Sequence, residues 1–296
     1  MGTSSTTSPY LDYLFSSNSH GKWLRNYITI GARAHGSLNI NDDDLMALPV
    51  PLPEGSNSLI EQQKIADCLK SLDEVIAAQG RKVETLKTYK RGLMQQLFPR
   101  EGETLPRLRF PDYRAAPGWE TKPLCDVAEN LDNRRVPVTA KDRATGEVPY
   151  YGASGVVDYV KEYLFDEDLL CVSEDGANLV ARTYPIAFAI SGKTWVNNHA
   201  HVLRFDDPAT QKLVELFLNF TDLRDFITGM AQPKLNREML DSIPIPLPLP
   251  EEQRKIANCF SSLDSQIAAE AERLDALKTH KNGLMQHLFP VPGEAL

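Results

Sequence analysis

Apolar residues recur at alternating intervals of four and three positions along two stretches of the chain, residues 57–99 and residues 249–290. A heptad pattern of this length predicts a coiled-coil seam, because a helix that packs on a globular core shows a wider apolar face. The alternative, two amphipathic helices lying on a globular body, fits this narrow stripe less well. The predicted seam consists of Ile65, Leu69, Leu72, Ile76, Val83, Leu86, Leu93, Leu97, Ile256, Phe260, Leu263, Ile267, Leu274, Leu277, Leu284 and Leu288.

The two predicted helices belong to an internal repeat. Residues 61–68 (EQQKIADC) reappear as residues 252–259 (EQRKIANC), and the match continues without a gap to GLMQQLFP at 92–99 and GLMQHLFP at 283–290. Upstream, LPVPLP at 48–53 matches IPIPLP at 243–248. Alternating prolines exclude a helix and favour an extended segment. Each copy therefore predicts an extended strand followed by a long helix.

Polar residues interrupt both seams at equivalent positions, Gln79 with Glu270 and Lys90 with Lys281. Polar seam residues lower stability but fix register and orientation. The first helix ends where the segment between the helices begins, and the second starts where that segment ends, so the two can pair only in antiparallel orientation. Each helix would extend roughly 50 Å, which corresponds to roughly 15 base pairs of DNA. We interpret the pair as a spacer.

The segment between the helices, residues 107–248, is expected to form a compact α/β (α+β) domain. Short β-like runs at 163–165, 169–172 and 186–190 are separated by turn clusters, and a helix is expected over 212–227. Several polar loops of this segment carry side chains of the kinds that read base edges or hold phosphates. The candidate DNA contacts are Arg134, Arg135, Tyr151, Ser154, Asn178, Lys193, Asn197, Asn198 and His199.

Charge and composition limit the kinds of partner. The net charge of −8 argues against DNA binding by the whole surface, although basic side chains can gather on one face. No stretch of about 18 apolar residues exists, so no membrane contact is expected. The four cysteines are too scattered for a disulfide framework or a zinc site, and we expect a cytoplasmic protein.

Three motifs of enzymes were considered. Ser191-Gly192-Lys193-Thr194 lacks the earlier glycine of a phosphate-binding loop, and His199-Ala200-His201 has no clear partner ligands for a metal. Pro111-Asp112 followed by Glu120-Thr121-Lys122 has the spacing of a nuclease metal site, but the residues between look like a linker. We expect no catalytic residue and no metal site, with a metal-dependent nuclease as a minor alternative.

The alternating-proline strand, the heptad helix closing on GLMQxLFP and the duplication of both resemble the conserved regions of type I restriction–modification specificity subunits. The middle segment resembles one of their target recognition domains through Gly118-Trp119, residues 150–155 (YYGASG), 174–178 (EDGAN) and 197–201 (NNHAH). The resemblance covers nearly the whole chain.

The resemblance implies a sequence-specific subunit that binds double-stranded DNA and performs no catalysis. Two recognition domains, at opposite ends of an antiparallel coiled coil, would each read one half of a split DNA sequence. Two methyltransferase subunits would dock on the coiled coil and supply S-adenosylmethionine and the transfer to adenine N6. Restriction subunits, which act as motor and nuclease, would join them. The chain itself would need no cofactor.

The chain departs from the family pattern because full-length members carry two complete recognition domains. Residues 1–56 resemble only the C-terminal remnant of a first domain, since residues 10–15 and 23–28 echo the helix expected near 213–227, and residues 37–39 echo 234–236. We expect the chain to read one half-site or to form a homodimer that displays two copies. A rival interpretation is a coiled-coil scaffold whose globular domain binds protein rather than DNA. The DNA sequence cannot be derived from residue types alone.

Overall fold

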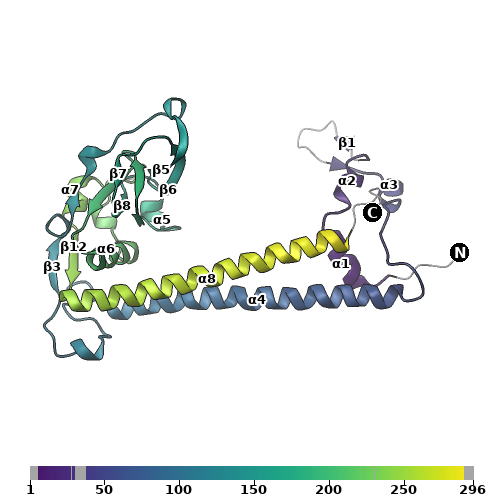
Figure 1. Ribbon diagram of the computed structural model, residues 1–296, viewed down its shortest axis with the longest axis horizontal. Coiled ribbons are helices and arrows are strands. Elements are labelled where there is room, and N and C mark those ends of the chain that lie inside the picture. The colour runs from purple at the N-terminus through teal and green to yellow at the C-terminus, as the bar shows by residue number, and fades with distance from the viewer. Residues whose placement is uncertain (1–5, 28, 31–37, 230, 290–296) are drawn as a thin grey trace. The chain divides into compact units, whose positions relative to one another are not determined.

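The computed structural model of the chain describes residues 6–27, 29–30, 38–229 and 231–289. It divides into two compact units (Figure 1), a first unit of Met1–Lys87 with Ser265–Leu296 and a second unit of Thr88–Asp264. Both boundaries fall inside the long helices α4 (Ser58–Leu97) and α8 (Pro250–Leu288), so each unit contains a part of both. The fold class, an α+β domain with long helices, is confirmed. Pro290, the last residue of the second predicted repeat, lies outside the described residues.

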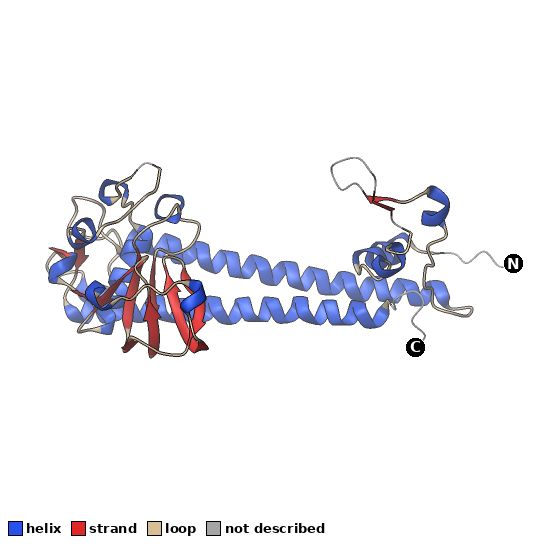
Figure 2. Cartoon of the chain, turned by 90° about the horizontal axis from the view of Figure 1, so that it is seen from above, coloured by secondary structure: helices blue, strands red, loops and turns tan. Residues whose placement is uncertain are grey.

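Within each unit, α4 and α8 lie side by side and run in opposite directions (Figures 1 and 2). In the first unit, the Gln79 amide donates to the Glu270 carboxylate at 2.6 Å, and Lys281 pairs with Asp73. In the second unit, Lys90 pairs with Asp264. Every residue of the predicted seam is buried or half-buried. The polar seam residues thus make cross-helix contacts, which fix the register of the pair.

The second unit contains three small sheets (Figure 2). The strand order is β4-β11-β8-β9 in an antiparallel sheet, β6-β5-β10-β7 in a mixed sheet where β10 runs parallel to β5, and β12-β3 in a two-stranded sheet. The strands are β3 (Glu120–Pro123), β4 (Glu129–Asn130), β5 (Thr145–Gly152), β6 (Gly155–Val160), β7 (Phe165–Asp166), β8 (Leu169–Ser173), β9 (Ala187–Ile190), β10 (Lys193–Val196), β11 (Ala200–Arg204) and β12 (Pro244–Leu247).

Strand β8 is buried at every residue because both faces of its sheet are covered. Leu170 and Val172 belong to a core shared with the helices, whereas Leu169 and Cys171 belong to a second core shared with the mixed sheet. A strand buried on both faces has a continuous apolar sequence rather than an alternating one. The predicted run at 169–172 therefore forms most of β8, the run at 163–165 contains the first residue of β7, and the run at 186–190 contains all of β9.

The predicted helix at 212–227 was placed too late in the chain. Helix α6 (Pro208–Phe220) begins where the Asp207 side chain accepts the Ala209 N–H at 2.9 Å, with Pro208 in the first turn. These residue types are favoured at these positions of a helix start. The remaining short helices of the unit are α5 (Asn178–Ala181) and α7 (Arg237–Asp241).

A buried ion pair links α8 to the segment between α4 and β3. The Arg109 guanidinium donates to both carboxylate oxygens of Glu252, at 2.8 and 2.7 Å. It also donates to the carbonyls of Ala116 at 2.7 Å and Pro117 at 2.9 Å. The two charged side chains are 6% and 1% exposed, so this contact is made away from water.

The first unit combines its part of the helix pair with α1 (Ser8–Ser16), α2 (Gly21–Leu24), β1 (Thr29–Ile30), β2 (Leu38–Asn39) and α3 (Asp42–Met46). Its core consists of Tyr10, Leu14, Leu69, Met285 and Phe289. No described helix has both the length and the apolar character that crossing a membrane requires.

Helix α1 contacts the helix pair as α6 does in the second unit. Asp73 and Asp264 are equivalent in the repeat; Asp73 accepts the Tyr13 hydroxyl of α1 at 2.9 Å, and Asp264 pairs with Lys212 of α6 at 3.0 Å. Both aspartates also hold the lysine of the facing long helix. Residues 1–56, where we expect the remnant of a recognition domain, thus contact the helix pair at the repeat position that α6 contacts.

In the residues just before the two proline-rich segments, the structure aligns the two copies of the repeat with a shift of two residues from the predicted alignment. Asn236 caps α7 by accepting the Met239 N–H at 2.9 Å, and Asn41 caps α3 by accepting the Asp44 N–H at 2.7 Å. The counterpart of Asn236 is therefore Asn41, whereas the predicted match of 37–39 with 234–236 placed Asn39 there. Ser37 lies outside the described residues.

Candidate nucleic-acid interface

Loops from distant parts of the second unit meet at one end of its sheets. The Ser173 hydroxyl donates to the carbonyl of Ala153, in the β5–β6 turn. The Glu174 N–H donates to the His199 carbonyl at 2.9 Å, which joins the loop after β8 to the β10–β11 loop. A β-bridge joins Asp175 to Lys234. We name the surface residues of these loops, Ser154, Asp175, Asn198, His199 and Lys234, the polar rim.

The polar rim offers several kinds of hydrogen-bonding group to a ligand. Ser154, Asn198 and His199 are exposed, and half of the Lys234 side chain is exposed. His199 Nδ1 lies 2.7 Å from Asp175 Oδ2. Hydroxyl, amide, imidazole and ammonium groups are the ones that contact base edges and phosphates in protein–DNA complexes. The Asp175 carboxylate faces His199, and the other groups of the rim are suited to contacts with base edges and, at Lys234, with a phosphate.

Asn197 supports the rim from below. Its side chain is 7% exposed, and its amide oxygen accepts the His199 N–H at 2.8 Å. Its own N–H donates to the Tyr151 carbonyl at 3.0 Å. Tyr151 is half-buried and stacks on Phe188 at 6.0 Å between ring centroids, and burial raises the pKa of its phenol. Both residues contact the rim loops from inside the domain, and Asn197 is buried.

Two further candidates use their polar groups inside the domain. Arg135 donates to Glu174 at 2.7 Å and to the Ala200 carbonyl at 2.8 Å, and its side chain is 12% exposed. The Asn178 amide oxygen accepts the Thr183 N–H at 3.0 Å, and its amide nitrogen donates to the Tyr184 carbonyl at 2.9 Å. The polar groups of both residues bond inside the domain, so we do not assign either residue to the DNA-binding surface.

Lys193 and Arg134 lie at the other end of β10 from the rim. Lys193 is exposed, with its ammonium 4.9 Å from the centroid of the Tyr163 ring. Arg134 lies over the Phe165 ring at 4.6 Å and pairs with Glu167 at 3.0 Å. The nine predicted contacts therefore do not form one patch. Ser154, Asn198 and His199 lie in the rim, while Lys193 and Arg134 form a second, aromatic-lined group.

Sequence reasoning missed a charged network in which Asp132, Arg135, Glu174 and His201 lie beneath the rim and connect to Lys234 of the rim, although Arg135 itself was a candidate. Ligand atoms of Asp132, Glu174 and His201 lie within 4.8 Å of one another, the spacing of a metal site. Arg135 pairs with both carboxylates, at 3.2 Å and 2.7 Å, and Lys234 pairs with Glu174 at 3.1 Å. These cations already supply the positive charge that a metal would bring. The HAH motif at 199–201 was the signal for this network, but its partners come from distant loops.

Burial and nearby positive charges have opposite effects on the pKa values of the two carboxyl groups of this network. Burial alone would raise the pKa of Asp132, but the hydrogen bond with His201 and the charge of Arg135 lower it overall. For Glu174, burial is again outweighed, by the hydrogen bond from Arg135 and by the charge of His201, so its pKa is lowered. Both groups are therefore held as carboxylates.

The predicted nuclease alternative gains no support from the geometry. Asp112 pairs with Lys255 of α8, and Glu120 pairs with Lys122 at 3.2 Å. Both carboxylates are mostly exposed, at 64% and 72%. Among the residues that the structure describes, they do not belong to a group with metal-site spacing.

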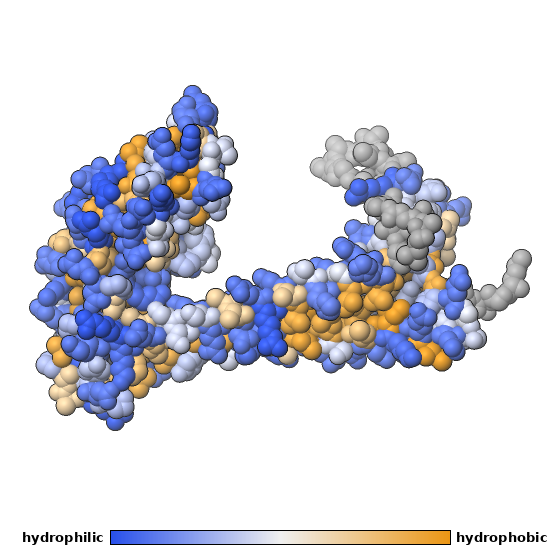
Figure 3. Space-filling view, in the orientation of Figure 1, coloured by the Kyte–Doolittle hydropathy of each residue, from blue (hydrophilic) through white to orange (hydrophobic). Residues whose placement is uncertain are grey.

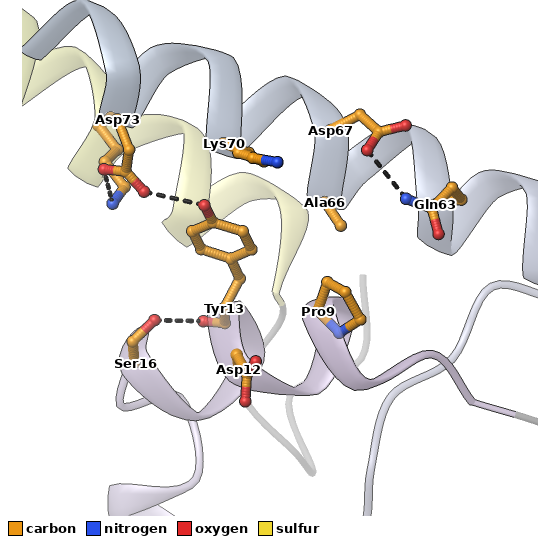
Figure 4. Close-up of a pocket in the computed structure, with 10 residues that line it drawn as sticks. Pro9, Asp12, Tyr13, Ser16, Gln63, Ala66, Asp67, Lys70 and Asp73 are labelled. Carbon is orange, nitrogen blue, oxygen red and sulfur yellow. Dashed lines mark hydrogen bonds and ion pairs between the residues drawn. The ribbon is translucent and has the colours of Figure 1, made fainter.

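The first unit has a different surface character. Figure 4 shows an open hollow of about 520 Å³ between α1 and α4, whose lining includes the carboxylates of Asp12, Asp67 and Asp73 and the side chains of Lys70 and Lys281. Carboxylates repel the phosphates of DNA, so this hollow does not resemble a DNA contact. On the face that Figure 3 shows, an apolar band follows the helix pair in this unit, whereas the second unit is mainly hydrophilic.

Comparison with known proteins identifies the family. A family model described as the type I restriction modification DNA specificity domain matches residues 117–279, more than half of the chain. A protein of Haemophilus influenzae named as a type I restriction enzyme specificity subunit is 34% identical over 144 residues, which cover 49% of this chain and 37% of that protein. The MjaX specificity subunit of Methanocaldococcus jannaschii is 24% identical over 290 residues, covering 95% of this chain and 67% of the relative.

Two solved structures share the fold. The crystal structure of a type I restriction–modification S subunit from M. genitalium superposes with a TM-score of 0.63 at 16% identity, covering 95% of this chain and 72% of that one. A chain from a study of type I complex assembly superposes with a TM-score of 0.60 at 17% identity, covering 96% and 71%. With the family match over the recognition domain and the second helix, the chain belongs to the family of type I restriction–modification DNA specificity proteins.

Proposed function

We propose that this chain is the sequence-specific DNA-binding subunit of a type I restriction–modification system, and that the polar rim reads part of its target. The observation that carries the proposal is that the β5–β6 turn and the β10–β11 loop both contact the end of β8, which brings Ser154, Asn198 and His199 to one surface of the domain that the family model matches. Base reading requires several donors and acceptors in fixed relative positions. The backbone hydrogen bonds between the loops favour such a fixed arrangement.

The second group, Lys193 with Tyr163 and Arg134, is proposed to hold the phosphate backbone. Among the residues that the structure describes, no carboxylate forms an ion pair with Lys193, whereas Arg134 shares Glu167 with Arg204. A lysine near a phosphate supplies affinity but no sequence information. Base contacts and phosphate contacts would thus come from opposite ends of β10.

The proposed partners follow from family membership. Methyltransferase subunits would dock on the helix pair and bring S-adenosylmethionine, and restriction subunits would join the complex. The chain spans 37% of the length of the H. influenzae relative, so the assembly of that protein is a proposal for this one. The chain would recognise the target sequence on DNA, and its partners would catalyse the reactions. Reading of one half-site and display of two half-sites by a homodimer are both compatible with one complete recognition domain.

The experiment is methylome sequencing of cells that carry the chain together with the methyltransferase subunit encoded beside it. We expect a methylated adenine motif that disappears in the triple variant Ser154→Ala, Asn198→Ala, His199→Ala. Asp225→Ala is the matched control, because Asp225 is an exposed acidic residue of the same unit and is unsuited to phosphate contact. Pull-down of the methyltransferase should be unchanged in all variants.

The outcomes separate the proposal from its rival. A motif that persists in the triple variant would remove the rim from the DNA interface. A wild-type chain that binds the methyltransferase without producing any methylated motif would contradict the specificity function. Loss of methyltransferase binding in the triple variant would favour the alternative, a coiled-coil scaffold whose globular domain binds protein.

A further inference from the structure

His201 is buried beneath the polar rim with both ring nitrogens facing acceptors. Its side chain is 1% exposed, Nδ1 lies 2.6 Å from the Asp132 carboxylate, and Nε2 lies 2.8 Å from the Leu235 carbonyl. A carboxylate and a carbonyl can only accept hydrogen bonds, and a neutral imidazole has one donor. Both contacts are satisfied only when the ring carries two protons.

The partners of His201 are the residues that hold the rim loops together. The Leu235 N–H donates to the Glu174 carbonyl at 2.8 Å, and the Glu174 N–H donates to the His199 carbonyl at 2.9 Å. Asp132 accepts the Val202 N–H of β11 at 3.0 Å with its other oxygen. Hydrogen bonds therefore lead from His201 through Leu235 and Glu174 to His199 in the rim.

Charged groups face His201 from every element around it. Asp132 and Arg135 come from the segment before β5, Glu174 from the end of β8, and Lys234 from the segment before α7. Cys171 of β8 is the other nearby titratable group, and burial together with the charge of Asp132 raises the pKa of its thiol. In the buried part of the network, Arg135 and the doubly protonated His201 balance the two carboxylates in number, while the Lys234 side chain is half-exposed. Loss of the second His201 proton would leave a lone pair facing an acceptor, which is costly in a buried site.

We propose that His201 is a positioning residue for DNA recognition, and that its doubly protonated ring holds the loops of the polar rim in their reading geometry. The inference rests on the proposed function but assigns a role to a residue that contacts no DNA. Because only the ring with two protons makes both contacts, recognition should be stronger at low pH, where the ring keeps both protons, than at high pH, where one has been lost.

The test compares the chain, in complex with its methyltransferase, on duplexes with the methylated motif and with a scrambled motif, between about pH 5.5 and pH 8.5. The specificity ratio is the Kd for the scrambled duplex divided by the Kd for the motif duplex. We expect this ratio to fall by about tenfold as pH rises, which is the effect of losing one hydrogen bond to a charged group. His201→Gln, whose single amide nitrogen reaches one acceptor at a time, should have the low ratio at every pH. Binding to scrambled DNA should change equally in wild type and variant.

His199 is the control for the pH profile, because it is an exposed histidine of the rim itself. In His199→Gln the pH dependence of the ratio should persist even if the ratio itself is smaller. A pH dependence that disappears in His199→Gln and persists in His201→Gln would overturn the inference and assign the effect to the rim.

Hydrogen exchange of the wild-type complex gives a readout that does not depend on a variant. The amides of Glu174 and Leu235 should exchange faster as pH rises, after correction for intrinsic rates, while amides of α8 should not. Unchanged protection of these two amides would overturn the inference. A wild-type complex with no preference for its motif at any pH would instead overturn the proposed function, and the two failures are therefore distinguishable.

Discussion

The buried Arg109–Glu252 pair gives the strongest prediction for stability. In Glu252→Ala the Arg109 guanidinium, 6% exposed, keeps its two carbonyl acceptors and loses its carboxylate. Removing one partner of a buried ion pair costs about 3–5 kcal/mol. At about 2–4 °C per kcal/mol for a protein of this size, the Tm should fall by about 10 °C. Thermal unfolding followed by circular dichroism measures this directly.

The repeat provides the matched control for this measurement. Glu61 is the residue equivalent to Glu252 in the first helix, and it is exposed. Glu61→Ala removes the same side chain at the same repeat position and should change stability by less than about 0.5 kcal/mol. Replacing both Arg109 and Glu252 by Met should recover part of the loss, because no unpaired charge is left in the interior. Equal Tm values for Glu252→Ala and Glu61→Ala would refute the reasoning.

Three further predictions concern stability. The pKa values of Asp132 and Glu174 are lowered in the folded state, so their contribution to stability is complete above about pH 4, the unfolded-state value, and is lost as pH falls through the lower folded-state values. In acid unfolding, Asp132→Asn should therefore lose less free energy of unfolding than the wild type. An identical acid transition in the two proteins would count against this. Removing the helix caps in Asn41→Ala or Asn236→Ala should each cost about 1 kcal/mol in urea unfolding, with Asp at either position retaining most of the stability. Gly80→Ala in α4 should stabilise by about 1 kcal/mol, because no atom beyond the adjacent helix backbone lies within 4 Å of the added methyl group, and a lower Tm would contradict this.

Much of the fold was predictable because its signals are periodic. The heptad stripe and the repeat predict α4 and α8, and the continuous apolar run at 169–172 predicts β8, since a strand covered on both faces needs no polar residue. Helix α6 was placed too late, although Asp207-Pro208 is a recognisable start, because the apolar periodicity is clearer than the cap.

The candidate site was less predictable because loop contacts leave no local pattern. Arg135 and Asn178 are residue types that often contact DNA, and nothing near them in the sequence shows that their donors are used inside the domain. Asp132 lies 69 positions before His201, the histidine that it contacts. Only the fold brings such residues together, so residue type and loop position alone could not separate the surface residues from those that support them.

The contact between Gln79 and Glu270 has a consequence for how such a repeat can evolve. The two residues are equivalent in the repeat and face each other, so this position meets its own counterpart. Two identical copies would place glutamate against glutamate or glutamine against glutamine. Because both copies are encoded in one chain, the position could diverge into an amide and a carboxylate, which bond at 2.6 Å. An assembly of separate, identical repeats has no access to this solution, so covalent fusion permits a heterotypic contact at the centre of an otherwise symmetric pair.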